Sequence, residues 1–363
     1  MKKSIIILVF CFVFVTASAI NGQSSKGSFA ERIKFSGTWF LGFHQGKMDG
    51  EDFSSFFIRR GYFTVRNSFN DKFSLRFTTD ITLDEEGDGE GDIEIRLKYG
   101  YINYKFGSLG FLNDLSAEFG IVHRPYITFA HDIYNYRVQG ATILDRFDMT
   151  SSADFGISFF GLLGGKMDNQ YIKSADDKHP GKFGSFGFGI YNGAGYHGIE
   201  KNKSKVFEGR ISLRPLWNLL PGLQLTYLGI FGKGNTDAEP DYNANAFDFS
   251  YQSSLINLQG LYYNGKGKQS GTLLDENGNV AKRKGYSAFA ELKIPGTKFA
   301  VFGRYDFVKN EFISYDVKNK LMIAGIGYTF LERNRVILNF EKLDSDELDE
   351  DNNFIEMVFD IRF

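Results

Sequence analysis

The chain has 363 residues, a length that admits two or more domains but also one long all-β unit, and its formal net charge of −2 gives no reason to expect a nucleic-acid partner. Its single cysteine, Cys11, lies in an N-terminal segment that we expect to be removed, which excludes disulfide frameworks, zinc-thiolate sites and cysteine nucleophiles from the mature chain. The 39 Phe, 19 Tyr and 41 Gly, with only 6 Pro, favour strands joined by tight turns.

The first 22 residues have the pattern of a cleaved export signal. Two lysines precede an uncharged apolar run from Ile5 to Val15, and Ala17-Ser18-Ala19 resembles a cleavage site. The run is too short, and wrongly flanked, for a transmembrane helix. We therefore expect a signal peptide over 1–22 and a single domain over 23–363, which could cross a membrane only as strands.

Apolar and polar residues alternate through most of the remaining chain, which is typical of strands with two different faces. In one segment Ile93, Tyr99 and Tyr101 fall on one face and Arg96 and Lys98 on the other. The alternation predicts strands at 33–44, 56–69, 72–83, 93–106, 115–124, 153–163, 182–192, 205–215, 222–232, 247–264, 284–294, 297–308, 319–330, 334–343 and 352–363. Within 247–264 the parity of the apolar residues reverses across Gln252-Ser253-Ser254, so a tight turn there would give sixteen strands, whereas a bulge would leave one long strand.

Three details favour a transmembrane antiparallel β-barrel of about 16 strands over a soluble sandwich. Phe and Tyr gather near strand ends, the polar faces carry charges of both signs, and the segments of about 10–14 residues are long enough to cross a bilayer at a tilt. An arginine turned into the bilayer midplane would cost about 2–4 kcal/mol, so the charged face is expected to line the lumen. An open edge in lipid would leave backbone groups unpaired, so the sheet must close.

The inward faces then carry a set of basic residues that could line a pore. They are Arg60, Arg66, Arg76, Arg96, Lys98, Arg124, Arg210, Arg214 and Arg304. Opposing carboxylates are Asp80, Glu94, Glu118, Glu208, Glu291, Asp306 and Glu341. Basic side chains along a pore favour anions. Alternatively, the two sets pair across neighbouring strands and only hold the lumen open.

The connections differ in length, which indicates two different ends of the barrel. Short ones lie at 70–71, 295–296 and 332–334, and long ones at 45–55, 84–92, 125–152, 193–204, 233–246, 265–283, 309–318 and 344–351. The connection 164–181 is long although it falls on the short side. The longest, 125–152, is expected to fold into the lumen and constrict it, with Tyr134, Arg137, Asp145 and Arg146 as candidate constriction residues; the alternative is an external flap.

No motif for catalysis or for a cofactor is present. The five histidines have no metal-ligand spacing, no nucleophile elbow is visible, and the glycine-rich stretches lack the phosphate-loop pattern. The acidic segment 84–92 fails as a calcium loop because Ile95 stands where the last ligand is required. We therefore expect no enzyme, no metal and no cofactor, and acidic surface loops that divalent ions could bridge to lipopolysaccharide.

Several stretches resemble the phosphate-selective porin O and P family, in the same order along most of the mature chain. They are FFIRRGYFTVRNSFNDKFSLRFTTDI, ITFAHDIYNYRVQGATILDR followed by SSADFGISFFG, GFGIYNGAG, EGRISLRPL, GYSAFAELKIPGTKFAVFGRYDF and MIAGIGYTFLERNRVILNFEKL. The resemblance implies a sixteen-stranded, commonly trimeric outer-membrane channel with basic residues along the pore and a constricting third loop. The matching positions are Arg59, Arg60, Arg76, Arg137, Asp145 and Arg146.

The sequence thus predicts an outer-membrane porin for passive diffusion of small polar or anionic, phosphate-like solutes. The alternative is a barrel with a closed lumen that acts as an adhesin or assembly protein. The final strand, 352–363, must pair with the first, near Ile33 to Phe43, to remove the sheet edges. By the same resemblance, the terminal Phe363 is expected to be the signal that the barrel-assembly machinery reads.

Overall fold

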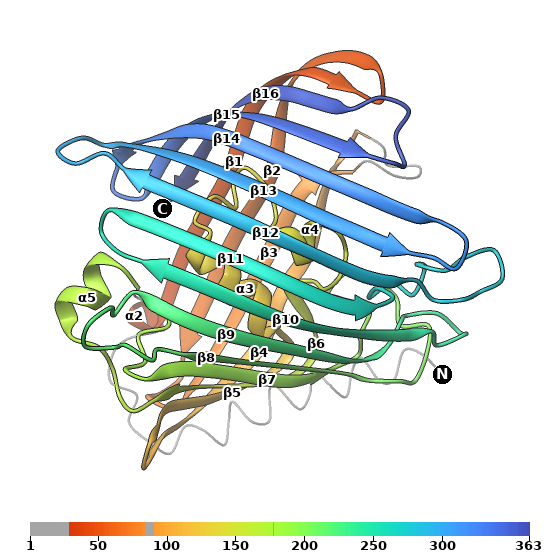
Figure 1. The fold of residues 1–363 in the computed structure, drawn as a ribbon. Helices are drawn as coiled ribbons and strands as arrows, with labels where there is room; N and C mark the ends of the chain where they lie inside the picture. Colours follow the sequence, from red (N-terminus) through yellow and green to blue (C-terminus); the bar gives the residue numbers. More distant parts are fainter. Residues whose placement is uncertain (1–28, 85–90, 177) are drawn as a thin grey trace.

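The computed structural model describes residues 29–84, 91–176 and 178–363, so the expected signal peptide lies outside the described residues. Sixteen antiparallel strands form one closed barrel in which each strand pairs with its neighbours in sequence and the last pairs with the first (Figure 1). The predicted fold class is therefore confirmed. No helix in the described part of the chain is long and apolar enough to span a membrane.

The strands and helices have the following bounds. The strands are β1 (Ile33–Met48), β2 (Glu51–Ser68), β3 (Phe73–Leu83), β4 (Ile93–Leu109), β5 (Leu112–His123), β6 (Ala153–Leu163), β7 (Gly184–Tyr191), β8 (Val206–Leu213), β9 (Leu223–Lys233), β10 (Asp241–Gln252), β11 (Ile256–Lys266), β12 (Lys282–Lys293), β13 (Phe299–Glu311), β14 (Asp316–Leu331), β15 (Asn334–Ser345) and β16 (Asn352–Arg362). The helices are α2 (Phe29–Arg32), α3 (Pro125–Ile133), α4 (Ile143–Arg146) and α5 (Asn169–Ser174).

The barrel closes where the sequence predicts, between β16 and β1. Thr38 lies opposite Arg362 in the register of this pair. Beyond it, the Gly37 N–H donates to the carbonyl of Phe363 at 2.9 Å, and the Phe363 N–H donates to the carbonyl of Gly37 at 3.1 Å. The Phe363 ring occupies the space that a Cβ at residue 37 would need, so the ring lies directly over Gly37 and would have to shift for a larger residue. The strand pairing thus continues to the last residue.

Two connections differ from the prediction. The long loops expected at 45–55 and 309–318 are instead continued strands, joined by turns at residues 49–50 and 312–315. The turn at Asp49 and Gly50 has positive φ at both residues, 51° and 80°, which suits a two-residue hairpin. Conversely, the split within 247–264 is confirmed, because β10 ends at Gln252 and β11 begins at Ile256. We call the end with the connections 69–72, 253–255 and 332–333 the turn side and the other end the loop side.

Two bulges change which side chains point inward. Opposite β1, the register of β2 skips Arg59, so the consecutive residues Arg59 and Arg60 both reach carboxylates inside the barrel. A second bulge, in β4, skips Lys98. The prediction that Tyr99 and Tyr101 share the outward face of Ile93 is therefore wrong: both rings are buried inside, while Ile93 is exposed.

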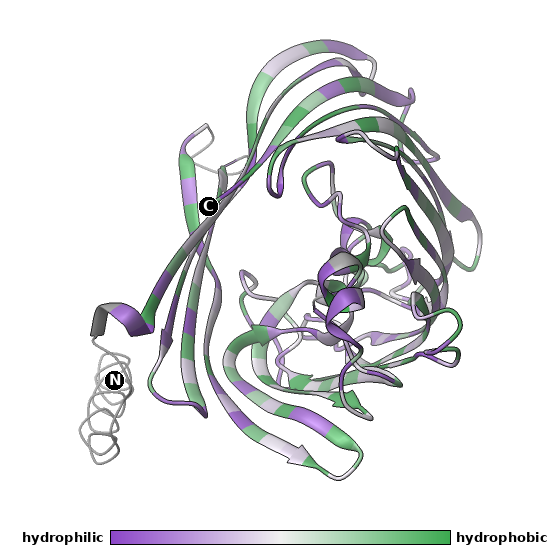
Figure 2. Cartoon of the chain, turned by 90° about the vertical axis from the view of Figure 1, so that its left-hand side faces the viewer, coloured by the Kyte–Doolittle hydropathy of each residue, from purple (hydrophilic) through white to green (hydrophobic). Residues whose placement is uncertain are grey.

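Connections enter the barrel from both sides. Seen along the barrel, helical segments other than α2 lie within the ring of strands and toward one side of it (Figure 2). From the loop side, residues 124–152 carry α3 and α4 inward, and nearly all apolar side chains of α3 are buried. From the turn side, residues 164–183 carry α5, which accounts for the unexpected length of that connection. We call residues 124–152 the inserted loop.

Candidate functional site

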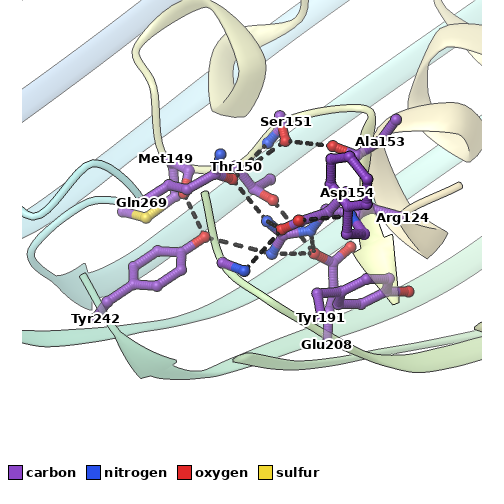
Figure 3. Close-up of polar contacts among 12 residues, drawn as sticks. Arg124, Met149, Thr150, Ser151, Ala153, Asp154, Tyr191, Glu208, Tyr242 and Gln269 are labelled. Atoms are coloured by element: carbon purple, nitrogen blue, oxygen red, sulfur yellow. Dashed lines mark hydrogen bonds and ion pairs between the residues drawn. The ribbon is translucent and has the colours of Figure 1, made fainter. Parts of the chain in front are cut away.

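The inserted loop is clamped at its base by one buried carboxylate. Arg124 donates from Nε to Glu208 of β8 at 2.8 Å, and its Nη2 lies 2.7 Å from the same carboxylate; both side chains are fully buried. Glu208 also accepts from the Thr150 hydroxyl at 3.2 Å (Figure 3). It accepts from the Tyr126 N–H as well, at 3.1 Å. A single side chain therefore holds the beginning and the end of the loop together.

Further partners complete this clamp. Gln269, from the connection 267–281, accepts from Arg124 Nη1 at 2.6 Å and from the Ser151 N–H at 3.1 Å. The Tyr242 hydroxyl donates to the Met149 carbonyl at 2.6 Å (Figure 3). Because every charged group here is paired out of contact with water, removing one partner would leave the other buried and uncompensated.

Apolar packing fixes the rest of the inserted loop against one half of the barrel. Ile127, Phe129, Ile133 and Leu144 form a core with inward residues of β8 to β13. The inward residues of that core are Val206, Leu228, Ile230, Tyr242, Ala244, Ala246, Leu261, Tyr263 and Val308. Where the loop packs against them, parts of these strands are apolar on both faces. We call β8 to β15 the covered wall.

Polar contacts continue along the covered wall to β15. Arg304 donates to the Ala141 carbonyl at 2.7 Å while pairing with Asp306 on its own strand. The Tyr136 hydroxyl donates to Glu291 at 2.8 Å. Gln139 and Arg146 both bind Glu341 of β15. The loop is thus attached at intervals across the whole covered wall.

The turn-side segment is held by a second buried arginine. Arg214 donates to the Tyr171 hydroxyl at 2.7 Å and pairs with Asp176 at 3.2 Å. His179 Nε2 lies 3.1 Å from Asp132 of α3, which joins this segment to the inserted loop. Arg214 therefore lies in a structural joint.

A cavity of about 770 Å³ remains beside the inserted loop. Its wall is formed by β1 to β4, which we call the free wall, together with the inserted loop, the α5 segment and the turn-side ends of other strands. Ten of its lining residues are basic and two are acidic. The basic residues are Arg66, Arg76, Lys98, Arg137, Lys173, Lys178, Lys293, Arg333, Arg335 and Arg362, and the acidic residues are Asp132 and Glu332.

Six of these cations have no ion-pair partner among the described residues: no carboxylate oxygen there lies within 4.0 Å of Arg66, Arg76, Lys98, Arg137, Lys173 or Lys293. Arg66 and Arg76 lie directly opposite each other on β2 and β3. Like charges in that position repel, so this face of the cavity favours an anion.

Arg76 is held in place by neutral partners. Its guanidinium lies 4.5 Å from the centre of the Tyr99 ring, and Nη1 is 2.9 Å from His123 Nε2. Because a guanidinium can only donate, His123 accepts at Nε2 and carries its proton on Nδ1, which faces Glu118 at 2.8 Å. The bulge that turns Tyr99 inward therefore supplies the platform for this arginine.

His131 lines the cavity without adding to its charge. Burial, followed by the nearby cations Arg137 and Lys98, lowers the pKa of His131 well below its ordinary value. It is therefore neutral at pH 7. No group of three or more His, Cys, Asp or Glu side chains in the described ranges could hold a metal ion.

The nine basic residues predicted to line a pore divide into two groups. Arg66, Arg76 and Lys98 line the cavity. The other six make hydrogen bonds or ion pairs away from its lining: Arg60 with Asp80, Arg96 with Glu94, Arg124 with Glu208, Arg210 with the Pro125 carbonyl, Arg214 with Asp176 and Arg304 with Asp306.

The four candidate constriction residues divide in the same way. Arg137 lines the cavity, whereas the Tyr134 hydroxyl donates to Gln139, Asp145 faces His131 and Arg146 pairs with Glu341. Sequence reasoning missed Lys173 and Lys178, although the unexplained length of their connection was the available signal.

This architecture, a sixteen-stranded antiparallel barrel with a long loop folded inside, is the porin type of fold. No protein-family model and no curated protein matches the chain. Among solved structures, it is similar to a loop L8 deletion mutant of OmpT, an outer membrane protein of Vibrio cholerae, with a TM-score of 0.60, 15% identity and coverage of 91% of this chain and 99% of that chain.

Two further solved structures show the same likeness. An anion-selective porin from Comamonas acidovorans matches with a TM-score of 0.59 and 11% identity over 91% of this chain and 98% of that chain. OmpF of Salmonella typhi, in complex with daunomycin, matches with a TM-score of 0.55 and 12% identity over 91% and 97%. At these identities the likeness establishes a general porin fold and does not reach the phosphate-selective family.

Proposed function

We propose that the protein is an outer-membrane porin, a water-filled channel that passes small anionic solutes by diffusion. The observation that carries the proposal is the cavity itself, with ten basic side chains against two carboxylates. A diffusing anion gains about 1 kcal/mol from a charge 4 Å away even in water, and several such charges act on it together. Diffusion needs no chemistry, so no residue is assigned a catalytic role.

The location in a membrane is supported by the outward face of the barrel. Phe77, Ile95, Phe119, Phe247 and Ile355 are 45–69% exposed on five different strands. A band of exposed apolar side chains around a closed barrel is unfavourable in water and suits lipid. Together with the export signal expected at 1–22, it supports a location in the outer membrane, with residues 23–363 as the barrel domain.

We include two finer statements in the proposal. The anions are small and phosphate-like, in keeping with the family that the sequence resembles. The assembled form is a homotrimer in contact with lipopolysaccharide, and Phe363, which directly follows β16 and is 68% exposed, is the signal read by the barrel-assembly machinery. Deleting Phe363 should then lower the amount of protein in the outer membrane without changing the amount exported.

A planar lipid bilayer with purified protein and a KCl gradient tests the channel. We expect discrete conductance steps and a reversal potential of the sign that chloride sets, and we expect added phosphate to reduce the chloride current. The absence of any steps would favour the alternative, a barrel with a closed lumen. Discrete steps with a reversal potential of the sign that potassium sets would support the porin function but contradict the anion preference.

A further inference from the structure

A second loop also crosses the interior of the barrel. Residues 192–205 connect β7 and β8 on the loop side, and Tyr196 extends from them to β3. Its hydroxyl donates to the buried carboxylate of Asp80 at 2.5 Å. Strands β3 and β7 are four positions apart in the ring of sixteen, so this contact links two strands a quarter of the way around the barrel. Asp80 also accepts from Arg60 at 3.1 Å.

Other side chains gather around this bridge at the same level of the barrel. The Lys98 ammonium lies 5.1 Å from the centre of the Tyr196 ring and 4.9 Å from that of Tyr62. Arg137, from the inserted loop, lies close enough to Tyr62, Tyr196 and Asp80 to interact electrostatically with each. We call Tyr62, Asp80, Lys98, Arg137 and Tyr196 the collar.

The collar coincides with the end of the cavity. Tyr62, Lys98 and Arg137 line the cavity, but Asp80, Arg60 and Tyr196 do not. The remaining lining extends from this level to the turn side, where it includes Lys293, Glu332 and Arg362. The Tyr196–Asp80 bridge therefore lies at the loop-side limit of the cavity.

The loop that carries Tyr196 is fixed at its base. The Gly193 N–H donates to Asp154 at 3.0 Å, and Asn235 donates to the Ile199 carbonyl at 2.8 Å. Gly195 has φ of 81° and lies against Gln269 and Ser151, where a side chain would not fit. The position of Tyr196 is thus set by the same clamp that holds the inserted loop.

We propose that Tyr196 sets the width of the channel: the narrowest passage is the collar, and its aromatic ring decides which solutes pass. This proposal rests on the proposed channel function and adds a residue from outside the inserted loop. A solute crossing the collar would pass beside the Tyr196 ring and the Lys98 and Arg137 cations next to it. Width and charge would therefore be set by different residues at one level.

Three variants in planar bilayers test the collar. Tyr196→Ala removes the ring, and we expect the single-channel conductance to rise about twofold, since pore diameter controls passage. Tyr196→Phe keeps the ring but loses the donor to Asp80, so its conductance should stay near that of the wild type with more frequent transitions between levels. Ile199→Ala is the matched control, because it alters a side chain of the same loop that is 81% exposed.

Swelling of vesicles that contain the protein gives a second readout. Arabinose should enter through the wild type, and raffinose should enter appreciably only through Tyr196→Ala. If the wild type conducts and Tyr196→Ala matches it in conductance and in raffinose entry, the proposal that Tyr196 sets the channel width is wrong, whereas the proposed channel function is retained. If neither the wild type nor Tyr196→Ala conducts, both the proposed channel function and the proposed role of Tyr196 are wrong. A silent wild type with a conducting Tyr196→Ala would support the collar as a seal and overturn the open channel.

Discussion

The covered wall, β8 to β15, and the free wall, β1 to β4, both present arginine to the interior, but in different surroundings. On the covered wall, Arg210 and Arg304 are 3–4% exposed and bond to loop carbonyls. On the free wall, Arg66 and Arg76 line a cavity with no carboxylate of the described chain in ion-pair range. The same residue type therefore serves attachment on one wall and an electrostatic surface on the other.

The difference follows from what each wall faces. A buried cation needs a partner for nearly every N–H, because unpaired charge away from water is costly. A cation that lines an open cavity can be solvated and needs no such partner, so it remains available to an anion that enters the cavity. The inserted loop thus determines which inward arginines are structural.

The largest expected effect comes from breaking the clamp on the covered side. Arg124→Met should lower the free energy of unfolding by about 3–5 kcal/mol, because Glu208 would remain buried without its cation. Arg96→Met, which removes a partly exposed pair with Glu94, should cost at most about 1 kcal/mol. Urea unfolding in lipid vesicles, followed by the fluorescence of Trp39 and Trp217, measures both. Equal losses in the two variants would contradict the distinction between the walls.

The sequence predicts the barrel well because strand alternation is a local property. It predicts the strand count, the closing pair and the inward side of most strands from the residues alone. It misplaces Tyr99 and Tyr101 because a bulge inserts one residue and reverses the face, and no residue type at Lys98 signals that insertion.

The division between the two walls is harder to predict, because it depends on contacts between distant segments. Arg124 and Glu208 are 84 residues apart, and Tyr196 and Asp80 are 116 apart. One local signal does exist: in β9, Leu228 and Ile230 are apolar on the inward face while Leu225 and Phe231 are apolar on the outward face. A strand that is apolar on both faces indicates that something covers it from inside.

A smaller effect is expected from neutralising charge on the free wall. Arg76→Gln should lower the anion-to-cation permeability ratio roughly fivefold, the equivalent of the ~1 kcal/mol that a unit charge contributes at 4 Å in water. Arg66→Gln should act similarly. Arg96→Gln, outside the cavity lining and paired with Glu94, should change the ratio much less. Reversal potentials in a KCl gradient measure the permeability ratio of each variant. A shift for Arg96→Gln as large as that for Arg76→Gln would mean that the ion pair with Glu94 does not keep Arg96 from acting on permeating ions.

The smallest expected effect is a dependence on salt concentration, which distinguishes the two walls without any mutation. The cations of the free wall act through electrolyte, whose screening length falls from about 10 Å at 0.1 M to about 3 Å at 1 M salt. The anion preference should therefore weaken when both solutions are concentrated at a constant concentration ratio. The ion pairs of the covered wall are out of contact with salt, so the urea midpoint of unfolding should stay nearly constant over the same range. An anion preference that persists unchanged at 1 M would locate selectivity at a desolvated point such as the collar, and a falling midpoint would show that the clamp is open to solvent.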